Sequence, residues 1–354
     1  MSSFKSHIDS LGTYKPPLDG RDPQQFELLD FNERTTPVSS LITDDLVAWI
    51  QSGRMQMYPS YGNITGSIAR YAGVDAANVM ITNGSDQGID MVFRACCEPG
   101  SEVIIPAPSF PMYAQSASIE NAVIKEPHYD FDTGYPLAEA LAMISDKTRV
   151  IVVSNPNNPS GTMLSREGVV ALADAAPMAV ILVDECYYEY CGESVCDLVE
   201  LHTNIIVTRT FSKTWGMPSL RIGYVIAAQE NIEALLKVRG PYDINQLAVV
   251  AVESALRHQE TVTNYIDEVM SKSKPVLEAF LSAQAIRYWP SVANFVWVFF
   301  DSPTYIEKQL RDAGILVRPK VDQMGVLGLR ITLGTLAQTE LLVGVLERCV
   351  AKSR

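Results

Sequence analysis

The chain has 354 residues, of which 47% are hydrophobic and 19% charged, and its formal net charge at pH 7 is −13. This composition excludes an intrinsically disordered chain, and the length is sufficient for a large core in one or two domains. The negative charge repels nucleic-acid phosphates, so we expect no nucleic-acid partner. The first ten residues resemble no secretory signal and no apolar stretch could span a bilayer, so we expect a cytoplasmic protein without membrane contact.

Six cysteines are scattered along the chain without a CxxC pair. Their spacing matches no standard zinc site, even when His202 is considered with them. We therefore expect reduced thiols and no bound metal.

Residues 1–47 are rich in Pro, Gly, Asp and Ser and predict an irregular N-terminal arm. Beyond the arm, short apolar runs alternate with helical segments. The predicted strands cover 79–82, 102–106, 122–125, 149–154, 179–184, 204–209 and 222–227, and the predicted helices cover 84–97, 114–119, 136–144 and 165–175. Most of the strands are continuously apolar, as in strands covered on both faces. The pattern predicts an α/β fold with a mostly parallel sheet and helices on both faces.

The pattern changes after Pro241. A long helical stretch over 245–280 precedes strands at 294–300, 314–318 and 327–333 and helices at 303–313 and 337–351, which indicates a smaller α+β domain. We predict an arm over 1–47 that packs with the small domain, a large domain over 48–245 and a small C-terminal domain over 246–354.

Polar side chains lie at or just after the ends of four of the predicted strands. They are Asn158 after strand 149–154, Asp184 as the last residue of 179–184 with Tyr187 after it, Ser212, Lys213 and Arg221 after 204–209, and Ser85 and Asp86 after 79–82. Because the carboxyl ends of parallel strands meet at one edge of a sheet, we expect these side chains to converge there.

Together these groups suit a phosphorylated pyridine aldehyde. A lysine desolvated at a strand end has a lowered pKa, which frees the amine to attack the aldehyde. A carboxylate keeps the pyridine nitrogen protonated, so that the ring accepts electrons. An amide and a phenol can hold a ring hydroxyl, while a helix N-terminus, a hydroxyl group and an arginine can bind a phosphate.

Each feature alone has an ordinary structural explanation, since a strand-end Asp is often a helix cap and Asn-Pro-Asn-Asn-Pro is a strong turn. Their order and spacing favour one common site. The pattern is NNPSGT after one strand, DECYY after the next and TFSK after the third, with Arg221 eight residues beyond Lys213.

With these motifs the chain resembles the class I and II aminotransferases, which are pyridoxal-phosphate enzymes of the aspartate-aminotransferase fold. Within that class it is most similar to the histidinol-phosphate aminotransferases. The resemblance runs from Tyr14 to Thr335, and its most specific segments are NGSDQGID (83–90), CEPGSEVIIPAPSFPMY (97–113), SNPNNPSGT (154–162), VDECYYEY (183–190), RTFSKTWGMPSLRIGY (209–224) and PYDINQLA (241–248).

The resemblance implies pyridoxal 5′-phosphate as the cofactor and assigns the residues that bind it. Lys213 forms a Schiff base and shuttles the proton, Asp184 pairs with the ring nitrogen, and Asn158 and Tyr187 hold the ring oxygen. Phe110 stacks on the ring, at a position where the family usually has Tyr. The phosphate is bound by Ser85, Asp86, Ser212 and Arg221, together with Tyr58 from the neighbouring subunit. The last contact implies a homodimer with shared active sites.

The resemblance also implies the reaction and the substrate pocket. Arg330 grips the anionic group of the substrate, Arg318 is a second anion-binding arginine, and Tyr14 and Asn158 line the pocket. An amino group moves from a donor, either histidinol phosphate or an amino acid such as an aromatic one, to a 2-oxo acid such as 2-oxoglutarate. Asn32-Glu33 is followed by Arg34-Thr35-Thr36, and Tyr58-Pro59 by Ser60 to Asn63. These departures from the family pattern, together with Phe110, leave the donor open.

Other classes of function make different demands on the sequence. A pyridoxal-phosphate decarboxylase or a specialised biosynthetic enzyme would use the same scaffold, and Arg330 does not separate it from an aminotransferase. A nucleotide-dependent dehydrogenase would need GxGxxG after its first strand, and the chain has none there. A binding protein that had lost activity would be expected to lack Lys213 or Asp184, and both are present.

Overall fold

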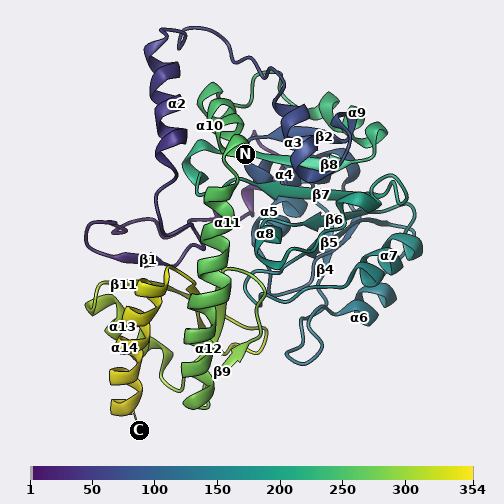
Figure 1. The fold of residues 1–354 in the computed structure, drawn as a ribbon. Coiled ribbons are helices and arrows are strands. Elements are labelled where there is room, and N and C mark those ends of the chain that lie inside the picture. The colour runs from purple at the N-terminus through teal and green to yellow at the C-terminus, as the bar shows by residue number, and fades with distance from the viewer. Residues whose placement is uncertain (1–2, 354) are drawn as a thin grey trace.

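The computed structural model describes residues 3–353, whose strands form two sheets (Figure 1). The larger sheet has seven strands in the order β2-β8-β7-β6-β5-β3-β4. All its neighbouring strands are parallel except β8, which runs antiparallel to both β2 and β7. The strands are β2 (Val79–Thr82), β3 (Glu102–Ile104), β4 (Val123–Lys125), β5 (Thr148–Ser154), β6 (Val180–Asp184), β7 (Ile205–Thr210) and β8 (Gly223–Ala227).

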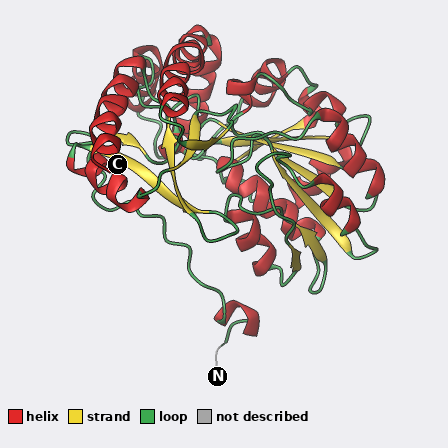
Figure 2. Cartoon of the chain, turned by 90° about the horizontal axis from the view of Figure 1, so that it is seen from below, coloured by secondary structure: helices red, strands yellow, loops and turns green. Residues whose placement is uncertain are grey.

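Both faces of this sheet are buried, which explains why its strands are continuously apolar. In β5, Val150 and Val152 pack into one core cluster, and Ile151 and Val153 pack into another on the opposite face. Helices α4 (Gly84–Cys96), α5 (Met112–Ile119) and α9 (Gln229–Val238) contribute to the first cluster, and α3 (Ile64–Ala72), α6 (Leu137–Ala142), α7 (Arg166–Ala175) and α10 (Gln246–Arg257) contribute to the second. Figure 2 shows the strands between two helical layers.

Local signals fix the ends of several helices. The side chain of Ser165 accepts a hydrogen bond from the backbone of Gly168 at the start of α7, and Asn245 caps α10 in the same way through Ala248. These contacts satisfy amides that have no partner inside the helix. Helix α3 ends at Gly73, whose φ of 73° is the left-handed conformation common at helix ends.

The smaller sheet has the order β1-β11-β12-β10-β9. Its strands are β1 (Glu27–Leu29), β9 (Arg287–Trp289), β10 (Phe295–Phe299), β11 (Ile315–Val321) and β12 (Leu327–Thr332). One face packs into a separate core with α11 (Glu260–Asp267), α12 (Lys274–Ala283), α13 (Pro303–Asp312) and α14 (Leu336–Ser353). The other face carries Trp297 and its register partner Arg330. Trp297 packs into a core cluster of the large sheet. The site lies on this second face.

The structure adds elements that the sequence pattern did not predict. Within the supposedly irregular arm, β1 pairs with β11, and α2 (Ser40–Gln51) begins before residue 47. The helical stretch predicted over 245–280 is divided between α10, α11 and α12, with a break at His258 and a π-helical turn, η4 (Glu268–Ser273). The remaining short elements are α1 (Ser6–Asp9), α8 (Tyr188–Cys191), η1 (Ala76–Asn78), η2 (Cys196–Leu198) and η3 (Pro218–Leu220).

We propose the domain division given above, since β1 of the arm pairs with the small sheet. Helix α10, at the proposed boundary, buries Ala248 and Val252 in the core shared with the large sheet. Within residues 3–353, no helix has the length and apolar character needed to cross a membrane.

Candidate active site

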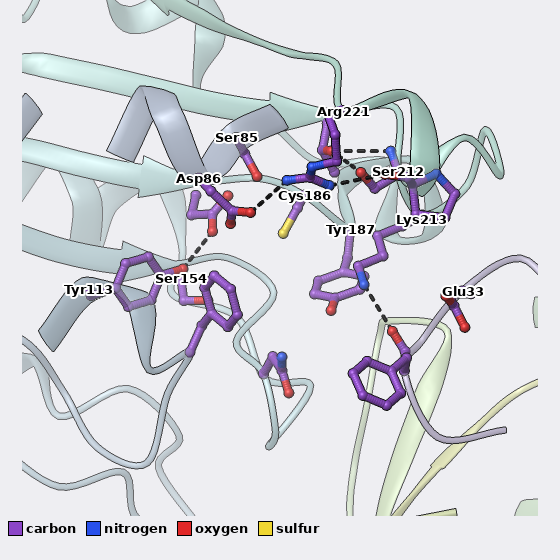
Figure 3. A pocket seen from close by; sticks show the side chains of 16 residues that line it. Glu33, Ser85, Asp86, Tyr113, Ser154, Cys186, Tyr187, Ser212, Lys213 and Arg221 are labelled. Carbon is purple, nitrogen blue, oxygen red and sulfur yellow. Dashed lines mark hydrogen bonds and ion pairs between the residues drawn. The ribbon is translucent and has the colours of Figure 1, made fainter. Parts of the chain in front are cut away.

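A cavity with about 760 Å³ of empty space, partly open to solvent, lies at the carboxyl ends of β2, β5, β6 and β7. This is the edge at which open parallel sheets bind ligands. Figure 3 shows side chains from several segments pointing into it. Nine of the predicted site residues line the cavity: Ser85, Asp86, Phe110, Asn158, Asp184, Tyr187, Ser212, Lys213 and Arg221.

One end of the cavity is built around Arg221. Its guanidinium Nη2 donates to Asp86 Oδ2 at 2.7 Å, and its Nη1 donates to the backbone oxygen of Pro218 at 3.1 Å. Arg221 has a φ of 52°, an uncommon left-handed conformation for a residue with a side chain. At Gly84, the first residue of α4, a Cβ atom would lie 2.5 Å from Arg221 Nη2. Glycine at this position therefore lets the guanidinium approach the start of the helix.

Asp184 forms the buried wall of the cavity. Its Oδ2 accepts a hydrogen bond from the hydroxyl of Tyr113 at 2.5 Å (Figure 3), and its Oδ1 accepts one from Thr208 at 2.9 Å. Burial raises the pKa of Asp184, while these two hydrogen bonds act in the opposite direction. No ion pair to Asp184 is present among the described residues. The site thus presents a buried carboxyl group that a cationic ligand would complement.

Lys213 follows β7 and is half-buried in the cavity wall. Its Nζ donates a hydrogen bond to the backbone oxygen of Phe31 at 2.9 Å, drawn as a dashed line in Figure 3. Burial lowers the pKa of this amine, and the charge of Arg330 lowers it further. A lowered pKa increases the unprotonated fraction, which is the nucleophilic form.

Tyr187 and Asn158 are held by residues from the small-domain side. The amide of Asn32 donates to the Tyr187 hydroxyl at 3.0 Å. Asn158 Oδ1 accepts a hydrogen bond from Arg330 Nη1 at 2.5 Å. The two side chains that the sequence assigned to one ring oxygen are therefore both tied to elements outside the large sheet.

Two of the predicted substrate residues, Arg330 and Arg318, lie on the small sheet beside this cavity. Arg330 on β12 and Arg318 on β11 are direct register partners, so their side chains share one face. Arg330 is buried, and Tyr14 lies close enough to raise its pKa electrostatically. Burial is the largest influence and lowers the pKa of Arg330 to about 10, and Arg318 lowers it as well.

Phe110 and Tyr58 differ in their placement. Phe110 lines the cavity and makes an edge contact with Tyr113, with ring centroids 5.7 Å apart. Tyr58 is 77% exposed and stacks on Tyr242 outside the cavity of its own chain.

The segments that depart from the family pattern lie in different places. Glu33 lines the cavity, whereas the Arg34 guanidinium lies over the ring of Tyr265, 4.5 Å from its centroid. Arg34 also donates to the backbone oxygen of Thr261. Ser60 donates its amide to Gln246.

Comparison with known proteins identifies the family. The model of "Aminotransferase class I and II" matches residues 44–346. The chain belongs to the class I and II aminotransferases. It is 32% identical to histidinol-phosphate aminotransferase 2 of Oceanobacillus iheyensis, over 97% of this chain and 98% of that protein.

Solved structures show the same fold. The histidinol-phosphate aminotransferase of Sinorhizobium meliloti, in complex with pyridoxal-5′-phosphate, superposes with a TM-score of 0.88 at 23% identity, covering 100% of this chain and 99% of that one. The L-threonine-O-3-phosphate decarboxylase of Porphyromonas gingivalis has a TM-score of 0.79 at 22% identity, covering 92% and 99%. The aspartate-aminotransferase-like fold predicted from the sequence is confirmed, and likeness at this level of identity shows the fold alone.

The cofactor of this aminotransferase is pyridoxal 5′-phosphate, and the cavity fits it. Asp184 is a buried carboxyl group without a cationic partner in the described chain, which suits a protonated ring nitrogen. At the other end, the start of α4, Ser212 and Arg221 suit a phosphate. Within residues 3–353, no group of His, Cys, Asp or Glu side chains is placed to hold a metal ion.

The sequence did not single out several residues that build the site. Thr208 is the register partner of Asp184 on the neighbouring parallel strand, so aligning the ends of β6 and β7 could have found it. Tyr113 lies in a segment that the resemblance covers, and its bond to Asp184 carried no local signal. From the arm, Phe31 lines the cavity and accepts a hydrogen bond from Lys213, and Asn32 donates one to Tyr187. The other lining residues are Glu33, Ser154, Cys186, Thr210 and Pro218.

Proposed function

We propose that this aminotransferase moves an amino group from a donor with an anionic group to a 2-oxo acid such as 2-oxoglutarate. The observation that carries the proposal is Arg330, a buried guanidinium that contacts Asn158 at the cavity and shares its sheet face with Arg318. Two neighbouring cations repel each other, and an anion bound between them offsets this repulsion. Histidinol phosphate is the first candidate donor, because the named relative is a histidinol-phosphate aminotransferase. An amino acid, including an aromatic one, is the second candidate.

The proposed roles of the cavity residues follow from their positions. Pyridoxal phosphate, when bound, supplies an electron-accepting ring that stabilises negative charge at the amine-bearing carbon of the substrate. Lys213 would attach the cofactor and carry the proton to and from that carbon. Asp184 would face the ring nitrogen, and Asn158 and Tyr187 the ring oxygen. The proposed phosphate ligands are Ser85, Asp86, Ser212 and Arg221, and Phe110 would pack on the ring face.

The direct test is Lys213→Ala. We expect the wild-type protein to be yellow and the variant to lose amino transfer by several orders of magnitude, because no other lysine lines the described cavity. Lys272→Ala changes an exposed lysine on η4 and should leave activity unchanged. Near-normal turnover by Lys213→Ala would overturn the assignment.

The donor is tested by comparing kcat/KM for histidinol phosphate, phenylalanine, tyrosine and other amino acids with 2-oxoglutarate as the acceptor. A preference of a hundredfold or more for histidinol phosphate would establish it as the donor. Release of carbon dioxide without consumption of a 2-oxo acid would instead support the decarboxylase alternative.

We also propose that the enzyme is a cytoplasmic homodimer whose subunits share active sites through Tyr58. Helix α2 and the segment after it expose Leu41, Val47, Ile50, Met55 and Met57, and Figure 1 shows α2 at the margin of the fold. An apolar surface of this kind is typical of a protein contact. A second copy of the chain would cover it and bring Tyr58 to the neighbouring cavity.

Light scattering at assay concentration tests the assembly, and an active monomer would contradict it. Mixing inactive Lys213→Ala with a Tyr58→Ala variant tests the sharing. Mixed dimers contain one site with both Lys213 and Tyr58, so mixing should restore activity above that of either variant alone.

A further inference from the structure

We propose that Lys320 is a third cation of the substrate anion site, so that this site selects a doubly charged group such as a phosphate monoester over a carboxylate. The inference rests on the proposed function and deepens it by naming the class of the donor. Lys320 lies on β11 two residues beyond Arg318, on the same face of the strand. Its register partner on β12 is Gly328, two residues from Arg330.

The three cations occupy two neighbouring rows of the small sheet. One row contains Phe295, whose ring contacts Tyr187 of the cavity, and its partner Thr332. The next row contains Trp297, Arg330 and Arg318. Lys320 lies in the row beyond it, roughly 7 Å further along the strand.

That order matches the geometry of a phosphate ester. In an amino acid, the carboxyl carbon is bonded directly to the carbon that bears the amine. In an amine such as histidinol phosphate, a methylene and an ester oxygen come between that carbon and phosphorus. The charged group of a phosphate ester therefore lies further from the reacting carbon than a carboxylate does. We expect such a phosphate to reach from Arg330 toward Lys320.

No acidic group in the described chain offsets these charges by an ion pair. Neither Lys320 nor Arg318 has a salt bridge or a hydrogen-bonded carboxylate within residues 3–353. Asp30 is close enough to act on Arg330, but its carboxylate is already bound by Arg21 at 2.8 Å. Burial and the repulsion from Arg330 and Arg318 lower the pKa of Lys320 to about 8, so at neutral pH it remains mostly a cation.

Two buried donors beside the cations also have no partner. Arg330 Nε and Trp297 Nε1 make no hydrogen bond within the described chain. A Cβ atom at Gly328 would lie 2.6 Å from Trp297 Nε1, so the indole N–H lies directly beside the partner of Lys320. Buried donors are nearly always satisfied in proteins, and an oxygen-rich anion would satisfy such groups.

The test uses the enzyme loaded with pyridoxal phosphate, so that the site of the cofactor phosphate is filled. Calorimetry measures the binding of inorganic phosphate and of acetate at matched ionic strength. Lys320→Met keeps the length of the alkyl chain and removes the charge, Lys320→Arg keeps the charge, and Lys308→Met removes an exposed lysine on α13 as the control.

We expect Lys320→Met to weaken phosphate binding at least about tenfold and to change acetate binding less than about threefold. Lys320→Arg should retain phosphate binding, and Lys308→Met should behave as the wild type. Unchanged phosphate binding in Lys320→Met, or an equal loss for both anions, would overturn the proposal.

A second arm measures the transfer of the amino group to the cofactor from the absorption change with histidinol phosphate, histidine and histidinol. These donors share the imidazole and carry a phosphate, a carboxylate and a neutral hydroxyl group. Of these three donors, Lys320→Met should lower the apparent affinity only for histidinol phosphate. Failure of the wild type to convert any donor would count against the proposed function, and the calorimetry would still decide the role of Lys320.

Discussion

Arg330 Nη1 donates a hydrogen bond to Asn158 Oδ1, which joins β12 of the small sheet to the loop that follows β5 of the large sheet. Arg330 Nη2 at the same time donates to the backbone oxygen of Asp30, at 2.6 Å. One guanidinium therefore connects three segments that meet at the cavity. Its Nε remains without a partner in the described chain. A planar group with several donors can hold this arrangement and bind an anion as well.

Replacing Arg330 by Lys should raise KM for the donor at least about tenfold, which corresponds to roughly 1.4 kcal/mol. The ammonium group keeps the charge but cannot reproduce the planar set of donors. Steady-state kinetics with the preferred donor measures the effect. Arg311→Lys, on the exposed face of α13, is the matched control. An unchanged KM would show that Arg330 does not bind the substrate anion.

Asp184→Asn should lower kcat by roughly a hundredfold or more, because it removes a preorganised charge from the buried wall. The amide is nearly isosteric, so the variant should fold and still bind the cofactor. Tyr113→Phe removes one hydrogen bond and leaves the carboxyl group, so its effect should be smaller. Asp174→Asn, at an exposed position on α7, serves as the control. Wild-type kcat in Asp184→Asn would refute this role.

The sequence predicted the cavity because Asn158, Asp184 and Lys213 each lie at or just after the carboxyl end of a strand, and parallel strands bring these ends together. It could not predict the partners of these residues. Thr208 meets Asp184 through the register of two strands, and Asn32 reaches Tyr187 from a distant part of the chain. Such contacts leave no local pattern.

The short strand β1 was missed because three residues show no periodicity, and it pairs with residues nearly three hundred positions away. Strand β11 was predicted to end at Arg318, before Pro319. In the structure it continues to Val321, because β1 stops pairing at Val317 and the proline then lies on an open edge, where no amide is needed. That extension is what aligns Lys320 with the two arginines.

Gly84→Ala should weaken cofactor binding at least about tenfold, since the new Cβ atom would lie 2.5 Å from Arg221 Nη2. Gly100→Ala is the matched control. Gly100 also has a positive φ, 89° against 72° for Gly84, but a Cβ atom there would meet no atom within 4 Å. Both variants should lose roughly 1 kcal/mol of stability from backbone strain. Only Gly84→Ala should release pyridoxal phosphate more readily on dialysis. The absorption of the bound cofactor measures this loss. Equal retention in both variants would contradict the role given to Arg221.

The carboxyl group of Glu189 should make the stability of the fold depend on pH. It is half-buried in α8 and accepts hydrogen bonds from Thr214 and from the indole of Trp215, both at 3.0 Å. Burial raises its pKa from 4.5 to about 7, with Arg209 acting in the opposite direction. Thr214 directly follows Lys213, so this carboxyl group is hydrogen-bonded to the neighbour of the proposed cofactor-binding lysine.

Because its pKa is raised in the folded chain, Glu189 holds its proton there to a higher pH than in the unfolded chain. Its contribution to the free energy of unfolding is complete below about pH 4.5 and is lost as pH rises toward 7. Glu189→Gln cannot ionise and should remove this part of the pH dependence, on the order of 2 kcal/mol between pH 5 and 8. Urea unfolding at several pH values measures the difference, with Glu139→Gln on the exposed side of α6 as the control. If the wild type and Glu189→Gln lose stability in parallel across this range, the carboxyl group is ionised throughout and burial does not control it.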